Sequence, residues 1–243
     1  MSSNPMINSH VAENVVLEGR PMTISNTINK TIILTGIVAL VAYYAWSVCA
    51  SGFTDKANML LIIGLIAGLV LAIITTRNPK HSPITAPIYA LCEGLVVGII
   101  SFQYAAFLDG IVQKAILITI STMFAMLFLY KSQLVRATEK FKKVLITAMT
   151  GIMVFYLVSL ICGLFGHFPI RLFDSSPLAI GITLFICIIA ALNFIVDFDF
   201  IEQSEKRMLP SYFEWYGGFT LLVTLIWLYI EVLRLLAQLN SRD

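Results

Sequence analysis

The sequence predicts an all-α integral membrane protein with seven transmembrane helices. Of its 243 residues, 58% are hydrophobic and only 12% are charged, and its mean hydropathy of +0.88 is far above that of soluble domains. A bilayer core of about 30 Å requires about 20 apolar residues per helix, and seven stretches meet that length. These stretches are continuously apolar, whereas barrel strands alternate apolar and polar residues, so helices are favoured.

The predicted helices are separated by short connections, so we expect one membrane domain over residues 31–239. A polar arm over residues 1–30 precedes it, and a short tail over residues 240–243 follows. Two G-x-x-x-G pairs, Gly64 with Gly68 and Gly94 with Gly98, predict close helix contacts. The predicted spans are Thr31–Cys49, Asn58–Thr75, Ala86–Ala106, Ile111–Tyr130, Val144–Gly166, Leu178–Phe200 and Tyr216–Leu239.

Lys and Arg in the short loops predict the orientation. The arm and the second, fourth and sixth loops hold eleven of the sixteen basic residues, so the amino terminus is expected in the cytoplasm and the carboxyl terminus outside. The arm contains no apolar segment with a cleavage site, which argues against a secretory signal peptide. No basic patch with interleaved aromatic residues indicates a nucleic-acid partner.

Acidic side chains within the apolar stretches are the candidate functional residues. An ionisable group at the bilayer centre costs between about 2.5 and more than 10 kcal/mol, so it usually faces a cavity or a partner. Glu93, Asp197, Asp199 and Glu231 qualify. For Glu93, a neutral brace between two helices and a functional role both remain open.

The last predicted helix carries nearly all its polar residues on one stripe, which predicts that this stripe faces away from lipid and that the helix is the polar spine of the bundle. Glu231 lies near the middle of this span. Arg234, three residues later, is placed to pair with Glu231 and keep it ionised; a purely structural pair is the alternative. The stripe comprises Gly217, Thr220, Thr224, Trp227, Glu231, Arg234 and Gln238.

The stretch "NFIVDFDFIEQ" places Asp197 and Asp199 at the end of the sixth predicted helix. Residues two apart on a helix point about 200° apart. Asn193 lies one turn before Asp197, so we expect Asp197 to face the interior and Asp199 to meet the headgroups or the cytoplasm. If the helix unwinds here, both reach the same vestibule.

An enzyme is not expected, because the sequence lacks the hydrolase, metalloprotease and aspartyl-protease motifs. The four cysteines lack the spacing and neighbouring His of a zinc site, and no Lys follows Tyr216 to form a retinal Schiff base. We therefore expect no cofactor.

The acid that closes the sixth apolar stretch and the segment "WLYIEVLRLL" resemble the Bax inhibitor-1 (transmembrane Bax inhibitor motif) family. The resemblance covers all seven spans and indicates a bacterial branch, hence the inner membrane. It implies six helices around a central seventh and a pH-sensitive Ca²⁺ leak. In that activity a carboxylate on each of the last two helices shares a proton and gates the path. Carried over by position, these are Asp197 or Asp199, and Glu231, which replaces the family's usual Asp.

The implied gate is electrostatic, because two close carboxylates cannot both ionise cheaply. A shared proton closes it, and higher pH opens it by repulsion. Asp197 and Glu231 would then hold Ca²⁺ transiently through oxygen atoms. Arg77 or Lys80 is a candidate latch on Asp197 in the closed state. Straight helices place the two acids roughly 17 Å apart in depth, so direct pairing requires a broken sixth helix or a seventh helix that starts in the cytoplasm.

A second class of function stays open. The chain is then a non-conducting regulator that binds other membrane proteins, such as a protease or a cell-death component, with the polar arm up to Lys30 as the docking segment.

Overall fold

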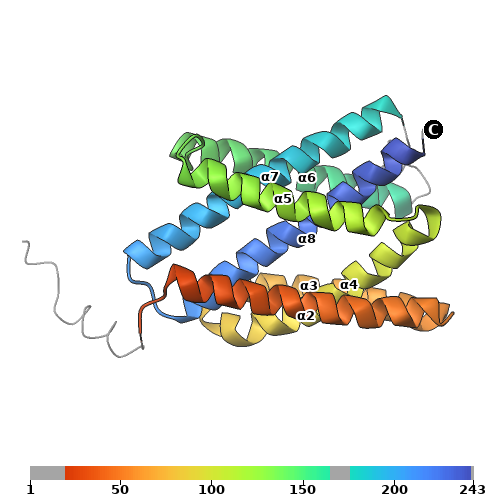
Figure 1. Cartoon of the computed structure of the whole chain (residues 1–243), viewed down its shortest axis with the longest axis horizontal. Coiled ribbons are helices and arrows are strands. Elements are labelled where there is room, and N and C mark those ends of the chain that lie inside the picture. Colours follow the sequence, from red (N-terminus) through yellow and green to blue (C-terminus); the bar gives the residue numbers. More distant parts are fainter. Residues whose placement is uncertain (1–19, 165–175, 242–243) are drawn as a thin grey trace, which may run out of the picture.

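The computed structural model describes residues 20–164 and 176–241, and this part of the chain is a bundle of seven long helices (Figure 1). A 3-10 turn, η1 (Pro79–His81), links the second and third of them. All seven helices are long and apolar enough to cross a membrane, which confirms the predicted fold class. The helices are α2 (Ile24–Ala50), α3 (Thr54–Arg77), α4 (Ser82–Phe107), α5 (Ile111–Lys131), α6 (Glu139–Leu164), α7 (Pro177–Lys206) and α8 (Tyr212–Asn240).

Several helices extend beyond the apolar stretches that predicted them. α2 begins at Ile24 because Thr23 caps it, accepting a hydrogen bond from the backbone N–H of Asn26. α7 continues through its acidic residues to Lys206. A helix satisfies its own backbone hydrogen bonds, so it does not have to end where its side chains become polar.

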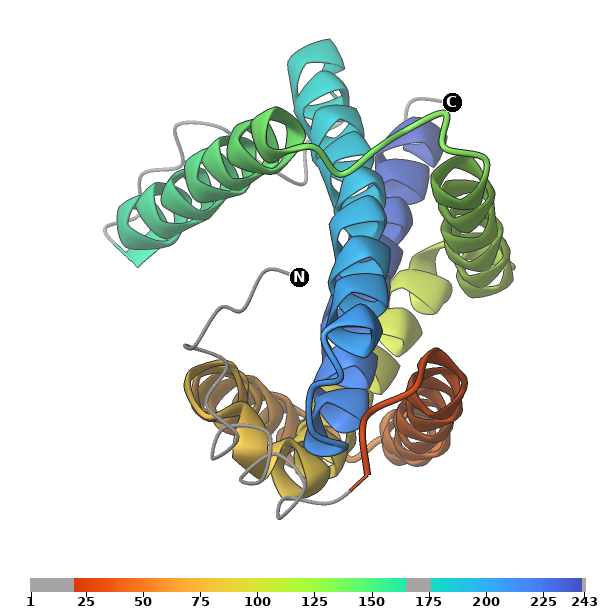
Figure 2. The same ribbon diagram turned by 90° about the vertical axis from the view of Figure 1, so that its left-hand side faces the viewer.

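Helix α8 lies at the centre of the bundle (Figure 2). It packs directly against α2, α4, α5 and α7, while α3 packs on α4 and α6 packs on α7. More than half of its apolar window, 56%, is buried, a larger share than in any other helix of the described ranges. The polar stripe thus marked the central helix, as predicted.

Both predicted glycine pairs lie at close helix contacts. A Cβ atom on Gly64 of α3 would lie 2.9 Å from the carbonyl oxygen of Cys92 in α4. A Cβ atom on Gly94 of α4 would lie 2.6 Å from that of Val41 in α2, and Gly98 meets the backbone of Ala42 in the same way. Since only glycine allows this approach, α2, α3 and α4 form a tightly packed unit.

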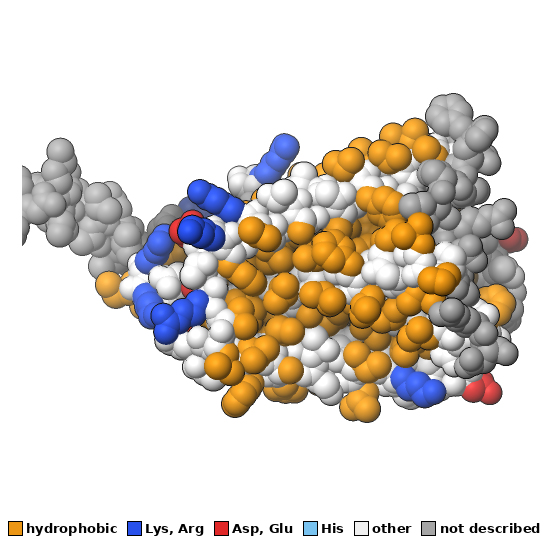
Figure 3. Space-filling model, turned by 90° about the horizontal axis from the view of Figure 1, so that it is seen from above, with side chains coloured by type: hydrophobic (Ala, Val, Ile, Leu, Met, Phe, Trp, Pro, Cys, Tyr) orange, Lys and Arg blue, Asp and Glu red, His pale blue; other side chains and the backbone are white. Residues whose placement is uncertain are grey.

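The two ends of the bundle differ in charge. Hydrophobic side chains cover the middle of the face in Figure 3, whereas Lys and Arg gather at the end where α7 turns into α8. We call this the basic end; its exposed residues include Arg77, Lys80, Arg136, Lys140 and Lys206. Outside the described residues lie positions 1–19 of the predicted arm, positions 242–243 of the tail and the end of the predicted span at Gly166.

Candidate functional site

Asp197 lies inside the bundle, at the contact between α7 and α8. Its side chain belongs to a residue only 7% exposed, and it accepts a 2.6 Å hydrogen bond from the hydroxyl of Thr224. That hydroxyl in turn accepts a 2.9 Å hydrogen bond from the side-chain amide of Asn193. Thr220 and Tyr216, on the preceding turns of α8, also face the carboxylate. Within residues 20–164 and 176–241, no basic side chain pairs with Asp197.

Asp199 faces another side of α7, as the helical geometry predicts. It forms a 2.7 Å ion pair with Lys142 of α6 near the basic end, where the two side chains are 14% and 29% exposed. α7 does not unwind between Asp197 and Asp199. The alternative in which both aspartates reach one vestibule is therefore wrong for this structure.

Glu231 is buried on α8 within a charged cluster. Its two carboxylate oxygens accept a 2.7 Å hydrogen bond from the Tyr156 hydroxyl of α6 and a 3.2 Å hydrogen bond from Arg234. Arg234 also donates to the Tyr156 hydroxyl at 2.8 Å. The predicted Glu231–Arg234 pair is present, and Tyr156 connects it to α6.

The register of α7 against α8 separates the two carboxylates. Asp197 lies level with Thr224, and Glu231 follows seven residues later on α8, about 10 Å along the helix axis. The separation is smaller than the roughly 17 Å expected from straight helices with level midpoints, because α8 is shifted along α7 toward the basic end, which brings Thr224 level with Asp197. Each acid has its own partners, so the expected pair of carboxylates sharing one proton is not formed in this structure.

The other candidate residues lie away from this contact. Glu93 is half-buried on the side of α4 that faces α3, and its Oε1 atom lies 3.0 Å from where a Cβ on Gly68 would be. Glu93 thus lies at the contact between α3 and α4, and both its role as a brace and a functional role stay predictions. Arg77 is exposed at the end of α3. Its role as a latch on Asp197 remains a prediction.

No group of three or more His, Cys, Asp or Glu side chains among the described residues is arranged to hold a metal ion. Asp197 and Glu231, at different depths, each offer a single carboxylate, which fits transient contact with a cation better than a storage site.

Sequence reasoning missed the partners of the acids. Thr224 was on the predicted stripe, but its bond to Asp197 depends on the α7–α8 register. Tyr156 lies within an apolar stretch, and Lys142 is one of several lysines in a loop. Nothing in the local sequence therefore indicated that either residue binds a buried acid. Partners on separate helices follow from tertiary packing, which local periodicity does not encode.

The fold and the site define a class of protein, a multi-pass helical membrane protein with ionisable groups buried along its central helix. The Bax inhibitor 1 like family model matches residues 4–241. The chain belongs to this family, as the resemblance predicted. No curated protein and no solved structure matches the chain.

Proposed function

We propose that this protein is a pH-sensitive Ca²⁺ leak pathway that follows the contact between α7 and α8. The observation that carries the proposal is Asp197, a carboxylate buried between these helices with hydroxyl and amide partners. Burial favours the neutral form of a carboxyl group unless a cation or several donors compensate. In this arrangement Asp197 is the group that exchanges a proton.

Glu231 has a different part in the proposed path. The groups that face it are Arg234, Tyr156 and Cys187, with Tyr104 of α4 beside Arg234. A carboxylate hydrogen-bonded to a guanidinium group keeps its charge. Glu231 therefore supplies a fixed negative charge on the far side of Asp197 from the basic end, and Asp197 supplies the variable one.

The mechanism follows from the sign of these charges. When Asp197 loses its proton, its negative charge lies among neutral hydroxyl and amide groups and, among the described residues, has no cation to compensate it. The α7–α8 contact then opens, or water and a cation enter it. Bare carboxylate oxygens suit Ca²⁺, a hard cation. The flux is expected to rise with pH, by up to about ten-fold per pH unit below the midpoint, the limit for one titrating group.

The test is Ca²⁺ uptake by liposomes that contain the purified protein, scanned between about pH 5 and pH 8. Asp197→Asn should make the flux independent of pH, because the amide cannot ionise. Asp199→Asn is the matched control, since it is the same substitution two residues later on the same helix, and it should leave the pH dependence intact. A wild-type protein that passes no Ca²⁺ at any pH, or equal effects of the two substitutions, would contradict the proposal.

A second candidate function is the binding of another membrane protein, and it is favoured by the position of α6. Among the described helices α6 packs mainly on α7, and Figure 2 shows it lying apart from α2, α3 and α4. Between α6 and Trp227 of α8 lies an open cavity of about 500 Å³ whose lining is mostly apolar. Such a surface within the membrane suits an apolar helix of a partner. The substitution Trp227→Ala would enlarge this cavity and change the surface offered to a partner helix. If the wild-type protein passes no Ca²⁺ and Trp227→Ala abolishes its role in the cell, the binding function is supported over the leak.

A further inference from the structure

The segment before α2 is held against the turn between α7 and α8. Pro21 and Pro210 stand opposite each other in an antiparallel bridge, and the backbone N–H of Met22 donates a 2.8 Å hydrogen bond to the carbonyl of Leu209. Further along α2, the Nζ atom of Lys30 lies over the ring of Trp215 of α8, 4.6 Å from the ring centroid. The start of the first described helix and the turn between the last two therefore form one structure.

Two glutamates of the α7–α8 region bind the amino-terminal end of α2. Glu205 accepts a 2.8 Å hydrogen bond from the backbone N–H of Ile24. Glu214, only 1% exposed, accepts from the backbone N–H of Thr23 at 3.3 Å and from the side chain of Asn26 at 3.0 Å. The first N–H groups of a helix lack partners within the helix, and negative charge is favourable at this end.

Glu214 also contacts Arg20, with 3.4 Å between Nη2 and Oε2. The Arg20 side chain is 65% exposed, so this ion pair contributes little by itself. We call Glu205 and Glu214, with the α2 groups that they bind, the clasp. Its main strength lies in the hydrogen bonds to the helix end.

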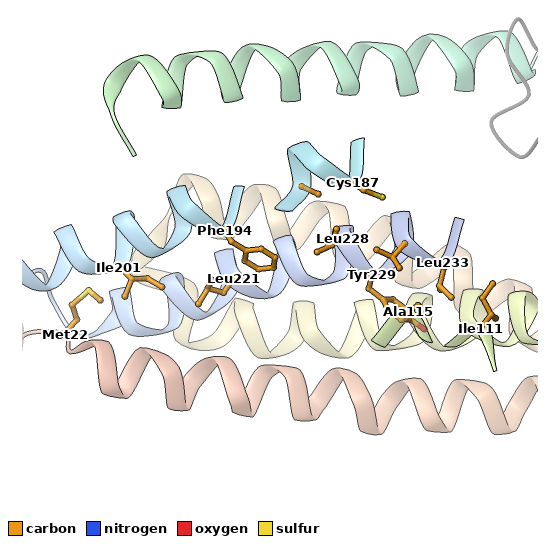
Figure 4. Packing of buried hydrophobic residues seen from close by; sticks show 12 residues of the cluster. Met22, Ile111, Ala115, Cys187, Phe194, Ile201, Leu221, Leu228, Tyr229 and Leu233 are labelled. Atoms are coloured by element: carbon orange, nitrogen blue, oxygen red, sulfur yellow. The ribbon is translucent and has the colours of Figure 1, made fainter. Parts of the chain in front are cut away.

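Beneath the clasp, a tightly packed layer separates Asp197 from the basic end. Met22 is 1% exposed, Thr27 is fully buried and Ile201, one turn after Asp197 on α7, is 6% exposed. Figure 4 shows Met22 and Ile201 at one end of the buried cluster. A Cβ atom on Gly217 of α8 would lie 2.9 Å from Thr27 and 3.0 Å from Ile201, so three helices meet here without space for water.

We propose that the amino-terminal end of α2 is a gate that closes the route from the basic end to Asp197, and that Glu205 and Glu214 hold it shut. The position of the layer supports this, because Met22 lies just before α2, Thr27 lies on α2, and Gly217 of α8 approaches both Thr27 and Ile201. Releasing the clasp frees the end of α2 and removes Met22 and Thr27 from the layer. The inference rests on the proposed function in assigning this gate to the leak pathway, but access to Asp197 can be measured without any flux.

The first experiment measures access. In a background without Cys49, Cys92, Cys162 and Cys187, Asp197→Cys serves as the reporter in nanodiscs, and the probe is a positively charged, membrane-impermeant methanethiosulfonate. Glu205→Gln with Glu214→Gln should raise the labelling rate by about ten-fold or more, since the amides bind the helix end more weakly than carboxylates do. Glu139→Gln, an exposed acid of α6 near the same end, is the control and should change nothing.

A reporter at Ile186→Cys distinguishes gate opening from unfolding, because Ile186 is deeply buried on α7 at 1% exposure. It should stay unreactive in the clasp variant. An unchanged rate at position 197, or an equal rise at both reporters, would overturn the gate.

The second experiment locks the gate without removing the clasp. Residues opposite each other in an antiparallel bridge are within reach of a disulfide, so Pro21→Cys with Pro210→Cys should cross-link on oxidation. The cross-link should reduce Ca²⁺ flux by about ten-fold or more, and reductant should restore it. Flux that is unaffected by a complete cross-link would overturn the gate. If the wild type passes no Ca²⁺, the proposed function fails by itself, and the labelling experiment still decides on the gate.

Discussion

Asp197 and Glu231 are both buried acids at the α7–α8 region, but their surroundings are opposite in kind. Asp197 is bound by the hydroxyl of Thr224, which is bound by an amide. Glu231 is bound by a guanidinium group and a phenol. The comparison teaches that burial alone does not assign a role to an acid in a membrane protein. The partners decide the role, and we propose a fixed charge at Glu231 and an exchangeable one at Asp197.

The largest expected effect comes from removing the cation beside Glu231. Arg234→Gln leaves Glu231 as an uncompensated buried charge, and such a change costs about 3–5 kcal/mol. The apparent melting temperature in detergent should fall by about 10 °C. The double variant Arg234→Gln with Glu231→Gln should regain most of this loss, because no charge then remains to be compensated. An equally large loss in the double variant would mean that the pair is not what stabilises this level of the bundle.

A smaller effect is expected from removing the hydroxyl donor to Asp197. Thr224→Val keeps the shape of the side chain but leaves Asp197 and Asn193 without their shared partner, which costs about 1–3 kcal/mol. Because donors to a carboxylate favour its ionised form, the rise of Ca²⁺ flux should move to higher pH. Thermal melting and the liposome pH scan measure the two consequences. Thr183→Val is the comparison variant, because Thr183 is buried on α7 but donates to the backbone of its own helix, and it should leave the pH profile unchanged. A pH profile that does not move with Thr224→Val would argue against Asp197 as the proton-exchanging group.

The smallest effect is expected at the ion pair between Lys142 and Asp199. Both side chains are partly exposed near the basic end, and such pairs contribute about 0–1 kcal/mol. Lys142→Ala should therefore change the melting temperature by no more than a few degrees and leave the pH profile of the flux as it is. A large change in the pH profile would place Asp199 on the pathway and weaken the distinction between the two aspartates. A large fall in the melting temperature would mean that this ion pair contributes more than a partly exposed pair usually does.

The sequence predicted the fold more completely than it predicted the contacts between helices. Continuous apolar stretches indicated seven spans, and the stripe from Gly217 to Gln238 indicated the central helix, because both features depend on helical periodicity and on the membrane as a solvent. The inward position of Asp197 and the neighbourhood of Glu231 and Arg234 follow from spacing on a single helix. These parts of the site required no knowledge of how helices pack.

The remaining parts of the site depend on register between helices. Tyr156 reaches Glu231 from α6, and Glu214 reaches the end of α2 across 191 residues of sequence. Glu205 and Glu214 read as ordinary polar residues of a loop, since nothing in their local sequence shows that a helix end lies beside them. The expected sharing of a proton between Asp197 and Glu231 also depended on register. The register places Asp197 level with Thr224 and not with Glu231.

The clasp also orders events in time during synthesis of the chain. α2 is among the first helices to leave the ribosome, but the group that binds its first N–H, Glu205, lies 181 residues later. At about 5–20 residues per second, the end of α2 waits roughly 10 to 40 s for that partner. Until α7 and α8 are inserted, the first N–H groups of α2 therefore lack these carboxylate partners, and the clasp forms only after both helices have joined the bundle.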